Sequence, residues 1–283
     1  MNHTFAPSRA QLLAFAWLAL SSTHTLAQDG PPPGWVGPPP GWSGGVLLGA
    51  ARAPLFEGSR DSRSQPVLGA EITYRSASLG SVAMGSRGLQ WTVVQRPEFS
   101  AGVGLAVDPG RIDNGERKLT PLGYRPGSDS LRGLGEIRAT PVLQAFGSHT
   151  LGGLSLTATA RRATGSHEGA QLDLGLSLPW KIDSHTTLSI APSATWADRR
   201  FMQAFFGVTP MQSAASGYTV FEAGAGLKSS QLVLDFDMAL SRYWYINAVL
   251  QAKRLQGDAA DSPIVQKTRQ TSGLLVARYQ FQL

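Results

Sequence analysis

The sequence predicts an all-β protein, a transmembrane antiparallel β-barrel of the kind that spans a bacterial outer membrane. Three observations predict this fold class. Apolar and polar residues alternate with a period of two through most of the chain. No segment after the N-terminus offers the roughly 18 consecutive apolar residues that a membrane helix needs. The chain also ends in an alternating segment, so a membrane role would have to be met by strands.

The first 27 residues (1–27) predict an export signal. Arg9 supplies a positive start, residues 12–20 form an apolar block too short to span a bilayer, and Ala27 ends a cleavage site of small residues. Cleavage is expected near Ala27. The exported chain is expected in the cell outer membrane.

Residues 28–44 are rich in Pro, Gly and Trp and are expected to form a periplasmic tether. The sequence of residues 30–35, GPPPGW, is repeated at residues 37–42. Proline favours an extended conformation and lacks the N–H that a strand ladder uses. Two interpretations stay open: a passive linker, or a docking strip or barrel plug anchored by Trp35 and Trp42. The barrel itself is expected over residues 45–283.

The alternation is clearest near residue 235. Leu232, Leu234 and Phe236 fall on one face, whereas Asp235 and Asp237 fall on the other. Such segments run about ten residues, which matches an oblique crossing of a bilayer. They are longer than the strands of a soluble β-sandwich, the alternative that alternation alone leaves open. Aromatic residues near the segment ends fit the girdles of a membrane barrel.

The number of strands is expected to be even, and about 12, within a range of about 10 to 14, fit the alternating segments. The strand assignment has two alternatives at 78–95, where residues 84–88 fit either a turn between two strands or a glycine bulge in one strand. The expected strands are 45–53, 65–75, 78–84, 88–95, 98–108, 136–147, 150–162, 168–179, 184–196, 227–240, 242–254 and 270–283.

The connections differ in length, which predicts their sides of the membrane. Short connections are expected in the periplasm and long ones outside the cell. The short ones are 147–149, 180–183 and 240–242, and the long ones are 109–135, 197–226 and 255–269.

The longest connection contains a helix signal. Thr209 and Gln212 form a capping box around Pro210, and Gly217 provides a C-terminal cap, so a short helix is expected in this extracellular loop. Just before it, residues 197–208 interleave aromatic and basic side chains. Two interpretations stay open: a contact with a ligand or partner, or a lid over the barrel mouth with phenylalanines packed in a small core. The candidate contact residues of the outer loops are Asp198, Arg199, Arg200, Phe201, Phe205, Phe206, Asp258 and Asp261.

Asp258 and Asp261 allow more than one role. They are candidates for a cation site or for ion pairs with Arg199, Arg200 or Arg254. Two carboxylates are too few for calcium, which takes six to eight oxygen ligands. A turn cap, or a latch between long loops, is therefore the favoured interpretation, and no metal site is expected.

Charged residues on the polar faces of the expected strands are candidates for the barrel lumen. Two arrangements are open: the charges line a narrow channel, or they pair across the lumen and close it. The candidate lumen charges are Arg161, Asp173, Asp235, Asp237 and Arg278, with Lys253 as a further candidate.

Several functional classes are disfavoured by the sequence. Cys is absent, which excludes disulfides, thiolate metal sites and an acylated cysteine anchor. The net charge is +6, but the basic residues are scattered, so no nucleic-acid partner is expected. His149, His167 and His185 fall in separate expected elements, and Ser166, His167 and Glu168 are too close in sequence to form a triad. We therefore expect no enzyme activity and no cofactor.

The end of the chain resembles the terminal β-signal of outer-membrane barrels. Leu275, Tyr279, Phe281 and Leu283 share one face of the last expected strand, although the chain ends in Leu rather than in the Phe of that signal.

Four segments resemble the hallmark segments of the MipA/OmpV family of outer-membrane proteins: residues 131–137 (LRGLGEI), 197–217 (ADRRFMQAFFGVTPMQSAASG), 221–230 (FEAGAGLKSS) and 257–265 (GDAADSPIV). The resemblance covers roughly residues 45–283. It implies a barrel in contact with outer-membrane lipid that acts as a scaffold, bringing a lytic transglycosylase together with a bifunctional penicillin-binding protein. OmpV-like relatives are linked to osmotic response, adhesion and antibiotic permeability, so a small solute channel and a surface adhesin are the alternatives.

Overall fold

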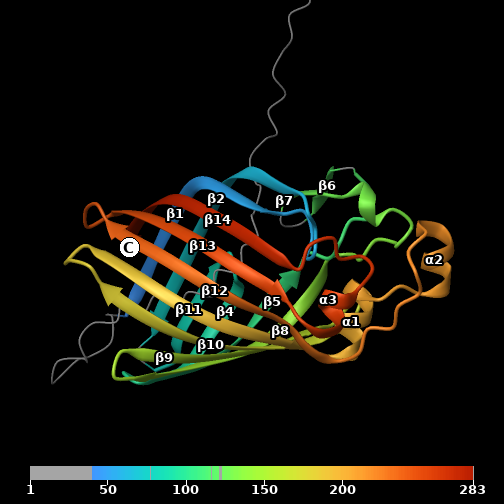
Figure 1. Cartoon of the computed structure of the whole chain (residues 1–283). Coiled ribbons are helices and arrows are strands. Elements are labelled where there is room, and N and C mark those ends of the chain that lie inside the picture. The colour runs from blue at the N-terminus through green and yellow to red at the C-terminus, as the bar shows by residue number, and fades with distance from the viewer. Residues whose placement is uncertain (1–39, 77, 116, 121–122, 283) are drawn as a thin grey trace, which may run out of the picture.

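The computed structural model describes residues 40–76, 78–115, 117–120 and 123–282. The expected export signal at 1–27 and most of the expected tether, residues 28–39, lie outside the described residues. Twelve strands of the described chain close into an antiparallel barrel, as the sequence predicts (Figure 1). The barrel strands are β1 (Gly41–Pro54), β2 (Ser62–Ser76), β3 (Gly80–Gly85), β4 (Gly88–Gln95), β5 (Phe99–Asp108), β8 (Thr140–Leu151), β9 (Leu154–Ala163), β10 (Ala170–Lys181), β11 (Thr186–Ala197), β12 (Gly226–Ala239), β13 (Trp244–Leu255) and β14 (Arg269–Gln282).

The outer surface of the barrel is apolar, whereas the inner surface combines polar side chains with a buried apolar cluster that includes Val233, Val249 and Leu274. In β12, Leu232 and Leu234 are 42% and 37% exposed, whereas Asp235, the residue after Leu234, is 1% exposed and faces inward. An exposed leucine costs free energy in water but not in lipid, so this arrangement requires a surrounding bilayer. The predicted alternation is therefore confirmed. Exposed residues that share the outward face include Leu48, Leu143, Leu172, Leu174, Leu176, Leu178, Leu250 and Leu275.

Apart from the turn between β3 and β4, the connections divide between the two ends of the barrel by length. The start of β1 pairs with the end of β14, Ser43 opposite Gln282, so these two strands close the barrel. At that end the connections are short. At the other end lie all the described helices, visible on the right of Figure 1. The connections on the helical side span residues 55–61, 109–139, 164–169, 198–225 and 256–268, together with the two-residue turn 86–87 between the short strands β3 and β4.

The first strand begins earlier than the sequence predicts. β1 starts at Gly41, so Trp42 belongs to the barrel wall and not to the tether, which was expected to reach residue 44. Trp42 packs on Tyr74 of β2 with ring centroids 4.8 Å apart, which fits an interfacial girdle. Glycines at positions 44 and 45 interrupt the alternation and conceal the strand in the sequence.

The turn between β8 and β9 lies later than expected. It is formed by Gly152 and Gly153, whose φ angles are +54° and +93°. Glycine adopts this left-handed region without the strain that a Cβ would cause. The expected turn at 147–149 is instead part of the ladder, with Ser148 opposite Thr157.

The region of 78–95 forms two short strands, β3 and β4, joined by a tight turn at Ser86 and Arg87. Because these strands are short, β2 pairs with β3 only from Ile72 to Ser76. On that side, no described strand pairs with residues 62–71 of β2. Pro66 lies on this edge, the place where a residue without an N–H is tolerated.

The long connections contain further short elements. The helix predicted from the capping box is confirmed: it begins at Pro210, Thr209 accepts a hydrogen bond from the N–H of Gln212, and Gly217 ends it with a φ of +81°. Two α-helices, a 3₁₀ helix and a hairpin were not predicted. The elements are β6 (Arg117–Thr120), β7 (Gly123–Pro126), the 3₁₀ helix η1 (Asp129–Leu131), α1 (Arg199–Phe206), α2 (Pro210–Ser216) and α3 (Gly257–Asp261).

Candidate functional site

The barrel encloses a cavity of about 1600 Å³, which is the candidate functional site. Its lining begins at the end with short turns, at Arg96 and Gly153, and reaches Phe201 and Phe206 at the helical end. We call this space the lumen cavity. Short turns face the periplasm in barrels of this type, so we expect the lumen cavity to extend inward from the periplasmic side.

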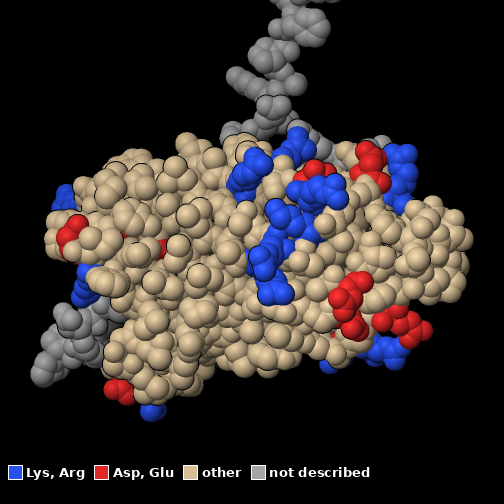
Figure 2. Space-filling view, viewed as in Figure 1, with Lys and Arg blue, Asp and Glu red and all other residues tan. Residues whose placement is uncertain are grey.

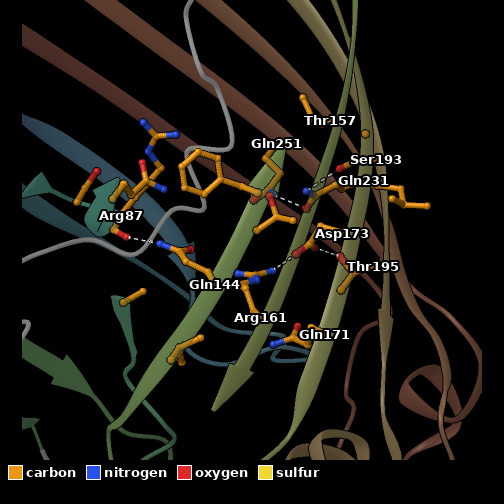
Figure 3. Close-up of a pocket in the computed structure, with 18 of the residues that line it drawn as sticks. Arg87, Gln144, Thr157, Arg161, Gln171, Asp173, Ser193, Thr195, Gln231 and Gln251 are labelled. Atoms are coloured by element: carbon orange, nitrogen blue, oxygen red, sulfur yellow. Dashed lines mark hydrogen bonds and ion pairs between the residues drawn. The ribbon is translucent and has the colours of Figure 1, made fainter. Parts of the chain in front are cut away.

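Polar side chains cover much of the wall of the lumen cavity. Gln251 of β13 donates to Gln231 of β12 at 2.6 Å, and Gln231 donates to Ser193 of β11 at 2.9 Å (Figure 3). On the opposite side of the view, Gln144 of β8 donates to the carbonyl oxygen of Arg87 at 3.1 Å. These hydrogen bonds hold flexible amide side chains against the wall, so these parts of the wall are ordered and hydrophilic.

One ion pair lies in the middle of the wall. Arg161 of β9 donates to Asp173 of the adjacent strand β10, and the hydroxyl of Thr195 donates to the second carboxylate oxygen at 2.6 Å (Figure 3). The side chains of Arg161 and Asp173 are 26% and 24% exposed. The carboxylate of Asp173 thus has two donors, one of them charged, which offset the cost of removing it from water.

The remaining candidate lumen charges also have partners on nearby strands. Arg278 of β14 lies 3.4 Å from Asp237 of β12, and Asn247 of β13 donates to Asp235 of β12 at 2.7 Å. These contacts run along the wall. The pairs therefore do not close the lumen by crossing it, which was one of the two arrangements expected from the sequence.

A second charge cluster lies nearer the helical end. Glu57, in the connection between β1 and β2, accepts hydrogen bonds from Lys228 of β12 and Lys253 of β13 at 3.0 to 3.1 Å. Burial alone would raise the pKa of Glu57, but the charges of the two lysines outweigh burial and hold this pKa below its ordinary value. The ammonium of Lys228 also lies 5.0 Å from the ring centroid of Phe201. The cluster thus ties the wall to the outer loops.

The sequence did not point to Lys228, because the period-two rule places it on the lipid face with Leu232 and Leu234. A register shift between β11 and β12 at Thr195 and Trp196 changes the phase, and Lys228 is 5% exposed and faces the lumen cavity. β-Bulges redirect side chains in this way. No local sequence signal marks this one.

Apolar side chains from several connections pack over the helical end of the barrel. Phe201, Met202 and Phe206 of α1 are 3%, 1% and 1% exposed. A neighbouring cluster joins Leu131, Val208 and Ile264, which come from three different connections. We call these packed connections the lid. The lid-core interpretation of the phenylalanines therefore fits the structure, with Phe205 packed at its margin.

Arg111 links the lid to the head of the lumen cavity. It is 6% exposed and donates to the carbonyl oxygen of Phe205 at 2.7 Å. Burial lowers its pKa to about 10, and the nearby charge of Asp113 opposes that shift. Within the described residues, its Nε and Nη2 have no hydrogen-bond partner.

The other candidate loop residues do not converge on one site. Asp198 caps α1 by accepting from the N–H of Phe201 at 2.8 Å. Arg199 and Arg200 are exposed and pair with Glu222 and Glu168, at 3.2 Å and 2.7 Å. Neither arginine pairs with the aspartates of α3.

Asp258 connects two of the long connections. Its Oδ2 accepts a hydrogen bond from the N–H of Gly224 at 2.6 Å, which is the contact expected of a latch. Asp261 is exposed. No group of three or more His, Asp or Glu side chains suitable for a metal ion occurs among the described residues.

The histidines lie far apart in the fold. His149 is in β8 near the short turns, His185 is in the turn before β11, and His167 is in an outer connection. His167 lies 3.4 Å from Asp108. Next to it, Ser166 donates to the carbonyl oxygen of Arg138 at 2.8 Å. The described residues around His167 therefore do not form a triad of nucleophile, base and orienting acid.

The described helices are all short: none has the length and apolar character required to cross a membrane.

Comparison with known proteins identifies one family. The family model described as MltA-interacting protein MipA matches residues 46–281. No curated protein matches the chain.

Solved structures with similar folds are distant in sequence. OmpT of Vibrio cholerae is 8% identical and covers 85% of this chain and 97% of its own, with a TM-score of 0.35. The outer-membrane channel DcaP of Acinetobacter baumannii is 9% identical over 85% of this chain and 98% of its own, with a TM-score of 0.39. The NanC porin is 6% identical over 83% and 98%, with a TM-score of 0.41. The fold assignment rests on the strand registers and not on these similarities.

Proposed function

Because this chain belongs to the family of MltA-interacting protein MipA, we propose that it is a non-enzymatic scaffold of the outer membrane that binds peptidoglycan enzymes at its periplasmic end. A closed barrel with an apolar outer face is the architecture of outer-membrane proteins. The family description names an interaction with MltA, and a lytic transglycosylase is the partner class that we propose. A bifunctional penicillin-binding protein is the second proposed partner.

One observation supports this proposal most. Four outer connections each contribute an apolar side chain to a single packed cluster: Phe56, Leu131, Val208 and Ile264. Such packing excludes water and holds the connections together across the outer end. A barrel covered at its outer end leaves the periplasmic turns and the mouth of the lumen cavity as the surfaces available to cell-wall enzymes.

Site-specific photo-crosslinking in intact cells tests the scaffold. A photoreactive residue is placed at Ser184 or at Gly152, both in short turns, and in a control at Met211, which is 84% exposed in the lid. The scaffold predicts adducts with a lytic transglycosylase from the turn positions and none from Met211. Absence of any peptidoglycan enzyme among the adducts of both turn positions would contradict it.

A small solute channel is the second candidate function, and the volume and polar lining of the lumen cavity favour it. Conductance in planar bilayers separates the two. A covered barrel gives no steady current, whereas a channel gives reproducible, ion-selective steps. Current steps that are recorded with the wild-type protein and disappear when a solute is added would favour the channel over the scaffold.

A further inference from the structure

Five exposed basic residues form a band around part of the outer surface of the barrel. Figure 2 shows basic side chains gathered across the face built from β1, β13 and β14, next to the lid. They point away from the lumen, unlike the charges of the candidate site. The residues that we call the basic band are Arg52, Arg60, Arg254, Lys267 and Arg269.

The strand register places two of these charges face to face. Arg254 of β13 is directly opposite Arg269 of β14, and both side chains are exposed on the lipid side of the wall. Like charges in opposite positions of a ladder destabilise the pairing. Arg52 of β1 lies on the other side of β14, opposite Gly273. The ladder thus concentrates positive charge on three adjacent strands.

The charges of the band are not neutralised within the described part of the chain. No ion pair joins any of the five residues to a described acidic side chain, and Arg52 makes one long hydrogen bond, 3.5 Å to the hydroxyl of Ser64. Asp61 adjoins Arg60 in sequence and is exposed at the edge of the band. The band therefore carries an excess of positive charge.

The basic band lies between the exposed leucines of the outer surface and the lid. Leu250 lies four residues before Arg254 on the same face and is 62% exposed, and Leu48 lies four residues before Arg52 and is 63% exposed. Four residues of strand correspond to about 13 Å. With strands tilted by about 40°, the charges lie about 10 Å further out than the leucines. The arginines therefore lie beyond the last large outward-facing apolar side chain of β1 and β13, on the side where lipid head groups are expected.

We propose that the basic band binds the phosphate groups of a lipid in the outer leaflet. The planar guanidinium groups of Arg254 and Arg269 match phosphate oxygens with paired N–H donors. A bound phosphate between them replaces their mutual repulsion by attraction. The exposed leucines below contact the acyl chains of the same lipid. This site is independent of the lumen cavity and of the proposed partners in the periplasm.

Binding of a defined lipid by the full chain tests the proposal. The probes are lipid A with two phosphates and the same lipid after enzymatic removal of both phosphates, each added to the folded barrel in neutral detergent and followed by native mass spectrometry. Each basic residue near an anionic lipid contributes about fivefold in affinity. The double variant Arg254→Gln and Arg269→Gln is therefore expected to bind the phosphorylated lipid about 25-fold more weakly. Equal binding of both lipid forms by the wild-type protein would overturn the proposal.

A matched variant separates this site from general attraction between charges. Arg242→Gln removes one exposed arginine from the turn between β12 and β13, at the periplasmic end. This variant is expected to bind the phosphorylated lipid as the wild-type protein does. The single variant Arg269→Gln is expected to bind this lipid about fivefold more weakly. A loss of the same size in Arg242→Gln would show unspecific adsorption and overturn the proposal.

The stability of the barrel provides a second readout. In neutral detergent without phosphate, Arg269→Gln is expected to raise the unfolding midpoint, because it removes the repulsion with Arg254. With the phosphorylated lipid present, the same variant is expected to have a lower unfolding midpoint than the wild-type protein. A variant that is less stable than the wild-type protein to the same extent in both conditions would assign Arg269 a purely structural role.

Discussion

Lys228 of β12 donates hydrogen bonds to both carboxylate oxygens of Glu57, each at 3.1 Å, although 171 positions separate the two residues in the sequence. The lysine side chain is 7% exposed and the glutamate side chain is 24% exposed. This pair, with Lys253, joins the connection after β1 to the wall formed by β12 and β13. Its removal should therefore affect both stability and the attachment of the lid.

Replacing Glu57 by Gln is expected to destabilise the folded barrel by about 3 kcal/mol, because two partly buried ammonium groups lose their shared counter-charge. Urea titration of the purified protein in detergent measures this change. Glu222→Gln is the matched control, because Glu222 pairs with Arg199 while its side chain is 79% exposed. An exposed pair contributes about 0 to 1 kcal/mol. Equal effects of both substitutions would mean that the Glu57 cluster is no stronger than a surface pair.

The same cluster predicts a pH dependence of stability. The pKa of Glu57 is lower in the folded protein than its ordinary value of 4.5, so folding favours the ionised form. The stabilisation is then complete above pH 4.5 and is lost progressively as the pH falls below that value. The difference in unfolding midpoint between wild-type protein and Glu57→Gln should shrink as the pH is lowered from about 7 to about 3. A constant difference over this range would contradict the shift.

The lid should depend on the side chain of Phe206, which is 1% exposed. Phe206→Ala removes a large apolar side chain from a packed cluster, a change that costs about 3 to 5 kcal/mol in protein cores. We expect the outer connections to become sensitive to added protease while the barrel ladder persists. Met211→Ala is the control, because Met211 is 84% exposed. Protease resistance equal to that of the wild-type protein would show that the lid does not rely on this cluster.

The hydrogen bond from Gly224 to Asp258 should act as a latch between two long connections. Asp258→Ala removes the acceptor and leaves a backbone N–H without its partner, at a cost of about 1 to 3 kcal/mol. Amide hydrogen exchange near Gly224 is expected to accelerate by at least about fivefold, which corresponds to the lower end of this cost. Asp261→Ala is the control in the same helix, because Asp261 is exposed. Unchanged exchange in Asp258→Ala would exclude the latch.

The unpaired edge of β2 should also be visible by hydrogen exchange. Residues 62–71 pair with β1 alone among the described strands, whereas Ile72 to Ser76 pair on both sides. Within 62–71, every second amide therefore lacks a partner in the ladder and should exchange faster than the amides of 72–76. Uniform protection along the whole of β2 would show that another segment covers this edge.

Much of the barrel follows from local sequence. In β12, Leu232 and Leu234 face lipid and Asp235 faces the lumen, as alternation alone predicts, because adjacent side chains of a strand point to opposite faces. The capping box of Thr209 and Gln212 also predicts α2, since a cap involves residues three apart. The helix α1 was not predicted, although Asp198 at its start is a strong N-terminal cap.

The candidate site is much less predictable. Arg161 and Asp173 were expected in the lumen, but Glu57, Lys228 and Arg111 were not singled out. Their positions depend on a bulge, a loop conformation and a bridge to Ile137, and each is a consequence of pairing between distant segments. The basic band was missed for the same reason, because Arg254 and Arg269 become neighbours only when β13 and β14 take their register.

The sequence alone is sufficient to establish a membrane barrel of about 12 strands, through its period-two pattern and the length of its strands. The reason is that successive side chains along each strand of such a barrel face lipid and lumen in turn. Tertiary structure alone decides which charges meet and which end is covered. Ion pairs such as Glu57 with Lys228, and a lid assembled from Phe56, Leu131, Val208 and Ile264, join residues that are far apart in sequence. Such contacts form only after barrel closure brings the strand ends together, and no local pattern encodes them.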